Sequence, residues 1–149
     1  MEIWKPHVTV AAVVEQDGRF LLVEEETAEG VRFNQPAGHL DAGESLLAAS
    51  IRETLEETAY AFVPTALIGI YQWPRPQGDF TYLRFAFAGK VGARETARPL
   101  DVGILRTVWL TPAEIAACQD RHRSPLVLQC VRDYLVGRSF PLDLLKHYD

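Results

Sequence analysis

The stretch from Gly38 to Tyr60, GHLDAGESLLAASIRETLEETAY, constrains the fold of this chain more than any other. Its first part is polar and carries glycines, and its second part has helical apolar periodicity, so it predicts a loop followed by a helix with Ser45 as N-cap. At about 100° per residue, the core face of that helix is expected to hold Leu47, Ile51, Thr54, Leu55 and Thr58. The opposite face carries three carboxylates, those of Glu53, Glu56 and Glu57.

These three glutamates are neighbours on the helix surface, and each neighbouring pair costs about a few tenths of a kcal/mol in repulsion. A hard divalent cation removes that cost, because Mg²⁺, or alternatively Mn²⁺, takes carboxylate and phosphate oxygens as ligands. Arg52 lies one turn before Glu56 and is expected to orient that carboxylate. Taken alone, the three glutamates also fit a solvated acidic face without a metal.

The wider pattern favours the metal site, because the stretch resembles the Nudix box, G-x5-E-x7-R-E-U-x-E-E-x-G-U, where U is a bulky aliphatic residue. Six fixed identities arise by chance roughly once in tens of thousands of chains of this length. They fall at Gly38, Glu44, Arg52, Glu53, Glu56 and Glu57, and bulky Tyr60 closes the pattern.

Two positions depart from the box. Thr54 replaces an aliphatic residue, and its hydroxyl is expected to bond back to the carbonyl of residue 50. Ala59 replaces the glycine after the helix, where a left-handed residue other than glycine costs about 1–2 kcal/mol. Both departures therefore bear on the helix and its end rather than on the glutamates.

Length and composition predict a single domain over residues 1–149, large enough to bury about two thirds of its unfolded surface. The net charge of -5 argues against broad nucleic-acid binding, which needs basic surface. Cys118 and Cys130 form no disulfide or zinc pattern, and no apolar run reaches the length of about 18 residues that spans a membrane. A cytoplasmic location is therefore expected, without membrane contact.

The first half of the chain also predicts two hairpins. Val8–Val14 and Phe20–Val23 are expected to pair as antiparallel strands across a Gln16-Asp17-Gly18 turn. The first run is apolar on both faces, which indicates a strand covered on two sides. Leu67–Trp73 and Thr81–Lys90 are expected to pair around a long loop at 74–79.

The second half predicts one more strand and two helices. The strand lies around Val108–Leu110, and Thr111-Pro112 with Glu114 forms a capping box for the first helix. A last helix is expected to start at Ser124-Pro125 and to run through Leu135, and the tail is expected to pack back onto the body.

Five residues outside the acidic helix are candidates for substrate binding: Gln35, His39, Trp73, Tyr82 and Arg84. His39 follows Gly38 and either contacts phosphate or faces solvent. The rings of Trp73 and Tyr82 either stack a heterocycle or belong to the core. Arg84 is either a phosphate clamp or an edge charge.

The resemblance implies a Nudix fold, an α+β arrangement in which a mixed sheet lies between helices, and a magnesium-dependent hydrolase. By position in the box, Glu56 and Glu57 are implied metal ligands, and Glu53 is a ligand or the base for water. Gly38 is implied to offer its backbone carbonyl to the metal. The implied task of Glu44 and Arg52 is to brace the loop against the helix. Asp101 is a candidate for a further acid from a later loop.

Short blocks from Lys5 to Leu145 also resemble a phosphatase subgroup of this family. That likeness implies release of terminal orthophosphate from nucleoside di- and triphosphates and from thiamine or hydroxymethylpyrimidine pyrophosphate. Two alternatives stay open: a non-catalytic nucleotide sensor, and a pyrophosphohydrolase giving monophosphate plus pyrophosphate, RNA 5′ ends included. A small phosphoanhydride is the expected partner, nucleic acid is not expected, and the chain is either a monomer or a homodimer.

Overall fold

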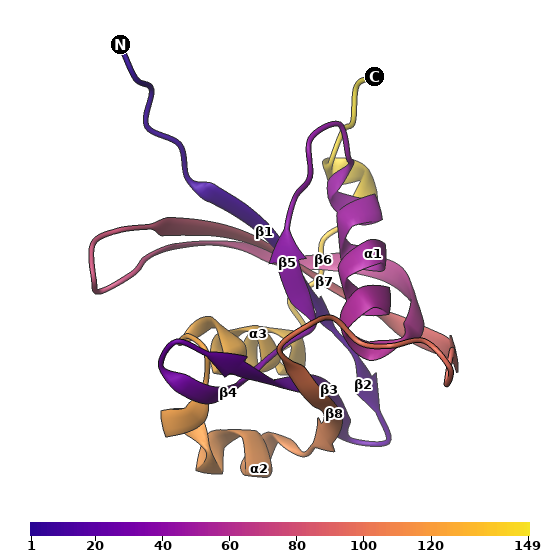
Figure 1. Ribbon diagram of the computed structural model, residues 1–149. Helices are drawn as coiled ribbons and strands as arrows, with labels where there is room; N and C mark the ends of the chain where they lie inside the picture. The colour runs from indigo at the N-terminus through magenta and orange to yellow at the C-terminus, as the bar shows by residue number, and fades with distance from the viewer.

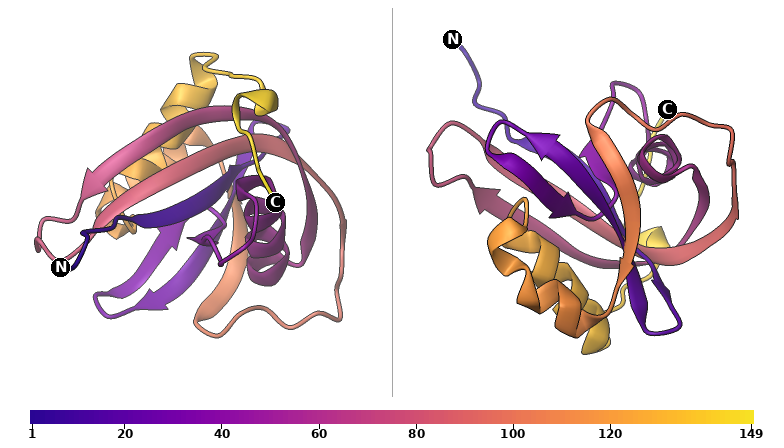
Figure 2. Two further views of the ribbon diagram at one scale, coloured as in Figure 1. Left: turned by 90° about the horizontal axis from the view of Figure 1, so that it is seen from above. Right: turned by 60° about the horizontal axis from the view of Figure 1, so that its bottom comes forward.

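A computed structural model describes residues 1–149 and shows two β-sheets, with α1 on one side and α2 and α3 on the other (Figure 1, Figure 2). The first sheet has the order β5-β1-β7-β6. In the second sheet, β3 pairs with β2 and β4 along one edge and with β8 along the opposite edge. The strands are β1 His7–Val13, β2 Glu15–Gln16, β3 Arg19–Thr27, β4 Gly30–Asn34, β5 Ala37–His39, β6 Tyr60–Pro74, β7 Thr81–Arg94 and β8 Ile104–Leu110. The helices are α1 Leu46–Thr58, α2 Pro112–Ala117 and α3 Leu126–Leu135, with short 3₁₀ turns η1 Gln119–Arg121 and η2 Leu142–Leu144.

The first sheet is mixed, as expected, because β1 runs parallel to β7 and antiparallel to β5. The predicted pairing of Val8–Val14 with Phe20–Val23 is wrong, since β1 and β3 lie in different sheets. The turn itself is confirmed: Asp17 and Gly18 have φ of 53° and 77°, but the hairpin that they close is β2 with β3. An apolar run shows that a strand is buried, but it does not show which sheet the strand joins.

Two apolar cores confirm that β1 is covered on both sides. Val13 faces a core closed by Val127 and Val131 of α3, whereas Val10 and Val14 face a core closed by α1. The same alternation continues along β3, β6 and β7, because successive strand residues point to opposite faces. The strands therefore form a rigid layer between the helices.

Helix α1 begins at the predicted N-cap, and its C-cap is Ala59, the position where the sequence departs from glycine. The hydroxyl of Ser45 accepts a hydrogen bond from the backbone N–H of Ala48 at 3.0 Å, and that of Thr54 donates to the carbonyl of Ser50 at 2.7 Å. Ala59 adopts the left-handed conformation with φ of 63°, and its N–H donates to the carbonyl of Leu55. The departure from glycine is therefore accommodated without displacing the helix end.

The predicted inner face of α1 needs correction. Ile51 is 40% exposed, whereas Glu57, expected on the outer face, is only 8% exposed. The face buried against the sheet is made of small residues and Glu57: Ala49, Ser50, Thr54, Glu57 and Thr58. Small side chains let the helix approach the strands closely, and this approach covers a carboxylate that the helical wheel leaves in solvent.

The C-terminal half follows the prediction. Thr111 caps α2 in a full capping box with Glu114, and the hydroxyl of Ser124 accepts a hydrogen bond from Leu126 N–H at the start of α3. The tail returns to the body, where Phe140 pairs with Leu67 of β6. None of the helices has both the length and the apolar character needed to cross a bilayer.

The close contact of β6 with β7 leads to a stability prediction at two glycines of β7. A Cβ on Gly89 would overlap the carbonyl of Val63 and the ring of Phe62, so Gly89→Ala is expected to lower the free energy of unfolding by about 1–3 kcal/mol. Gly92→Ala is the matched control, because the nearest atom to its Cβ would be 4.0 Å away. Urea denaturation measures both, and equal losses would contradict the packing argument.

Candidate active site

Three carboxylates meet beside the C-terminal half of α1. Oxygens of Glu53, Glu56 and Asp101 all lie within 4.8 Å of one another. Asp101 comes from the loop before β8, and its backbone N–H donates to the carbonyl of Glu56 at 3.0 Å, which holds the loop against the helix. The donor set is made of oxygens alone, which suits a hard cation such as Mg²⁺. The structure thus gathers two box glutamates with the acid expected from a later loop.

Glu57, the next residue of α1, is not one of these three carboxylates and lies in the interface between α1 and β5. Its Oε1 accepts a hydrogen bond of 2.9 Å from the backbone N–H of Ala37. Burial, together with the charges of Glu25, Glu53 and Asp101, raises its pKa to about 8. A carboxylate with so little compensation is destabilising when ionised, and a bound cation would relieve that cost.

Gly38 allows the close approach of helix and strand. A Cβ at this position would overlap the carboxylate of Glu53, so any larger residue would displace one member of the acidic group. Gly38 pairs with Val10 of the central strand β1, which fixes its place in the sheet. The glycine is therefore required by the position of Glu53, whether or not its carbonyl also contacts a metal.

Arg52 of α1 is hydrogen-bonded to the loop that precedes the helix. Its guanidinium makes two hydrogen bonds to Glu44, of 2.7 and 3.0 Å, and one of 3.0 Å to the carbonyl of His39. It also reaches Glu53 at 2.8 Å and Glu56 at 3.3 Å. These bonds raise the pKa of Arg52 and lower that of Glu44, so both side chains stay charged.

A cleft of about 700 Å³ opens beside these carboxylates, and Gly38, Glu53 and Glu57 belong to its lining. Four of the five residues predicted to bind substrate also line it: His39, Trp73, Tyr82 and Arg84. Gln35 does not line the cleft and is 1% exposed. Its amide nitrogen donates to the carbonyl of Val127, and its amide oxygen accepts from Arg84. Gln35 therefore holds the Arg84 guanidinium in position from the protein interior.

Aromatic rings form one end of the cleft. The rings of Trp73 and Tyr82 are nearly parallel, with an interplanar angle of 15° and centroids 6.1 Å apart. His7 lies beside Tyr82, with ring centroids 5.9 Å apart, and its Nδ1 is 3.4 Å from Nε2 of His39. Burial and the neighbouring His7 lower the pKa of His39, which favours the neutral form of its imidazole. Trp73 and Tyr82 line the cleft and belong to neither apolar core, so their rings are accessible from the cleft.

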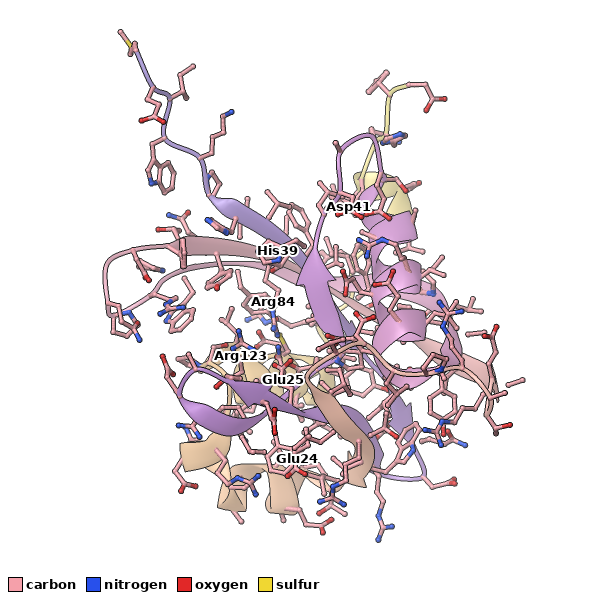
Figure 3. All side chains as sticks on the ribbon, viewed as in Figure 1. Glu24, Glu25, His39, Asp41, Arg84 and Arg123 are labelled. Carbon is pink, nitrogen blue, oxygen red and sulfur yellow. The ribbon has the colours of Figure 1, made fainter.

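Sequence reasoning missed the wall opposite Arg84. Figure 3 shows Glu25 of β3 and Arg123, just before α3, across the cleft from Arg84 and His39. Arg123 Nη1 donates to Glu25 Oε1 at 2.7 Å, although the two residues are 98 positions apart. No spacing pattern in one sequence links such distant residues. The one local signal is that charged residues directly follow the apolar run of β3, where successive side chains point to opposite faces of the sheet.

Comparison with known proteins gives a consistent assignment. A family model described as the NUDIX domain matches residues 5–129. Phosphatase NudJ of Escherichia coli K12 is 39% identical over 147 residues, covering 99% of this chain and 95% of the relative. A solved NUDIX hydrolase from Nitrosomonas europaea is 51% identical with a TM-score of 0.94, covering 97% of this chain and 98% of that one. MutT protein of Methanosarcina mazei, at 21% identity and a TM-score of 0.73, shares the fold over 93% of this chain and 100% of its own.

The raised pKa of Glu57 predicts a pH-dependent stability in metal-free protein. Between the ordinary value of 4.5 and about 8, the folded chain keeps a proton that the unfolded chain releases. Stability is therefore expected to fall as pH rises through this window. Glu57→Gln should flatten this dependence and be more stable than wild type at pH 8, by roughly a few kcal/mol.

Chemical denaturation in EDTA at several pH values measures this difference. Glu95→Gln is a matched control on an exposed loop, where removal of one carboxylate should leave the pH dependence as in wild type. A parallel pH dependence in wild type and Glu57→Gln would contradict the assignment of the slope to Glu57.

Proposed function

The chain belongs to the Nudix family of hydrolases, and from this premise we propose that it removes the terminal orthophosphate from small phosphoanhydrides. Nucleoside di- and triphosphates and the pyrophosphates of thiamine and hydroxymethylpyrimidine are the proposed substrates. The observation that carries the proposal is a single cleft lined by Glu53 and Glu57 together with Arg84 and an aromatic pair. The 39% identity to a protein named as a phosphatase supports the choice of reaction.

We assign the cation site to the acidic group beside α1. Glu53, Glu56 and Asp101 would hold Mg²⁺, with Glu57 and the carbonyl of Gly38 as further ligands at the cleft. When bound, the cation supplies charge neutralisation for phosphate oxygens and activation of water. Mn²⁺ takes the same oxygen ligands and is an alternative. The raised pKa of buried Glu57 supports the assignment, because a nearby cation favours its ionised form.

The chain's own residues then orient the reactants. Glu53 borders both the acidic group and the cleft, so its carboxylate can accept a proton from water beside the phosphate. The guanidinium of Arg52 holds the carboxylates of Glu53 and Glu56 in place. Its hydrogen bond to the carbonyl of His39 also holds the end of β5, which borders the cleft. Glu44 acts through Arg52 and does not line the cleft. The pair is therefore positioning machinery.

The organic part of the substrate is assigned to the aromatic end of the cleft. Trp73 and Tyr82 lie side by side on β6 and β7 and offer ring surface for stacking. The ring of His39 lies 6.5 Å from that of Tyr82 and lines the cleft, where it can contact a phosphate oxygen.

The two free cysteines support the expected reducing, cytoplasmic location.

The terminal-phosphatase proposal predicts the products. In the presence of Mg²⁺, a nucleoside triphosphate should yield nucleoside diphosphate and orthophosphate first, and a pyrimidine or thiamine pyrophosphate should yield its monophosphate and orthophosphate. Hydrolysis in ¹⁸O-labelled water followed by mass spectrometry measures this, because the label enters the phosphorus that is attacked. Early release of pyrophosphate would overturn terminal attack, and absence of any turnover would favour a nucleotide sensor.

The stacking assignment predicts a substrate-selective effect of Trp73→Ala. The KM for a ring-bearing diphosphate is expected to rise about 5- to 150-fold, because stacking on an aromatic side chain contributes about 1–3 kcal/mol per base. The KM for inorganic pyrophosphate should change little, since that molecule has no ring. Trp4→Ala, in the exposed N-terminal segment, is the matched control. Equal losses for both substrates, with a large fall in stability, would show that Trp73 is structural.

A further inference from the structure

Arg84 is a buried cation with neutral partners only. It is 6% exposed, and Nη1 donates to Gln35 Oε1 while Nη2 donates to Asn34 Oδ1, both at 2.9 Å. A third contact, of 3.8 Å, joins Nη1 to Sγ of Cys130. Burial raises the pKa of that thiol, so it stays neutral. No carboxylate comes within 4.0 Å of the guanidinium.

The other arginines around the cleft and the acidic group differ in this respect. Arg52 is paired with Glu44 and Glu53, and Arg123 on the opposite wall is paired with Glu25. Burying a cation without a counter-ion is costly, and neutral amide oxygens offset only part of that cost. Arg84 lines the cleft, so an anion entering from solvent can reach it and complete the pairing.

The strand register places Arg84 relative to the acidic group. Thr9 of β1 pairs with His39 of β5 on one side and with Arg84 of β7 on the other. Two strand spacings of about 4.8 Å therefore separate the backbone at Arg84 from the backbone next to Gly38, where the Glu53 carboxylate occupies the place of a Cβ. His39, Thr9 and Arg84 all line the cleft, so this row of residues leads from the strand beside Glu53 to the buried cation.

We propose that Arg84 binds the phosphate adjacent to the one attacked and thereby determines which phosphorus of the substrate reacts. The inference rests on the proposed function and adds to it the residue that decides which phosphate of the substrate lies at the carboxylates. With that phosphate fixed at Arg84, the terminal phosphate is the one that reaches the carboxylates. Arg84 is thus a specificity-determining residue, and Gln35 and Asn34 hold it in place.

The bond changes agree with this placement. The oxygen of water bonds to the terminal phosphorus as the bridging P–O bond breaks, and one proton of the water passes to a carboxylate and then to solvent. The electron pair of the broken bond stays on the bridging oxygen, which leaves with the adjacent phosphate. The charge of that phosphate increases during the step, and a fixed guanidinium beside it stabilises this increase.

Asn34→Asp is the sharpest variant, because it keeps the side-chain shape and gives Arg84 a carboxylate partner in place of a neutral amide. It should retain the fold and the position of Arg84 while neutralising the charge offered to phosphate. Arg84→Met removes the cation altogether. Gln119→Glu is the matched control, since it adds the same negative charge to the cleft wall without contact to Arg84.

The first measurement is the product ratio from a nucleoside triphosphate with Mg²⁺. Wild type and Gln119→Glu are expected to release orthophosphate, whereas Asn34→Asp and Arg84→Met should release orthophosphate and pyrophosphate together. The second is calorimetric binding of a methylene-bridged nucleoside diphosphate, which resists hydrolysis. Its affinity should fall roughly ten- to hundredfold in both variants, the scale of hydrogen bonds to charged groups. Melting temperatures check that each variant is folded.

A purely structural Arg84 would give a different result, because Asn34→Asp preserves and strengthens its contacts. Wild-type product ratio and affinity in folded Asn34→Asp would overturn the proposal, as would equal effects of Asn34→Asp and Gln119→Glu. Pyrophosphate release by wild type would overturn the terminal-phosphatase function instead. In that case a ratio that changes in both variants still supports Arg84 as the residue that sets the register, and an unchanged ratio refutes it.

Discussion

The structure depends on gathering carboxylates where α1, β5 and the loop before β8 meet. Their mutual repulsion and the burial of Glu57 oppose folding of this region in the absence of a cation. Arg52 offsets part of that cost through its bonds to Glu44, Glu53 and Glu56. The sheet supplies the rest of the support, because Gly38 is held by β1 and leaves room for the Glu53 carboxylate.

The two cores explain how such a site stays in place. Each face of the strand layer is covered, one by α1 and the other by α2 and α3, so the strands cannot shift without loss of packing on both sides. The cleft is lined by residues from elements far apart in the chain, among them β3, β5, α1, β7 and the segment before α3. A rigid scaffold of this kind keeps the carboxylates and the cations at fixed separations.

The two central arginines have opposite environments, and the difference follows from their partners. The charge of Arg52 is compensated by carboxylates, so this residue stabilises the loop and helix. Arg84 has only neutral acceptors, so its positive charge remains available to a ligand in the cleft. Pairing with Gln35 and Asn34 fixes the guanidinium without neutralising it. The same residue type thus braces the loop in one place and offers a positive charge to a ligand in the other.

The sequence by itself determined the loop and helix of the acidic stretch, the Asp17-Gly18 turn, the capping box at Thr111 and the family, because each depends on residues close together in the chain. Tertiary structure alone decided that β1 and β3 lie in different sheets, since an apolar run carries no record of its partner. It also decided that Glu57 is buried, because the depth of α1 in the sheet depends on small residues around it. The wall with Glu25 and Arg123 and the neutral surroundings of Arg84 arise from contacts across 46 to 98 positions, which local patterns do not encode.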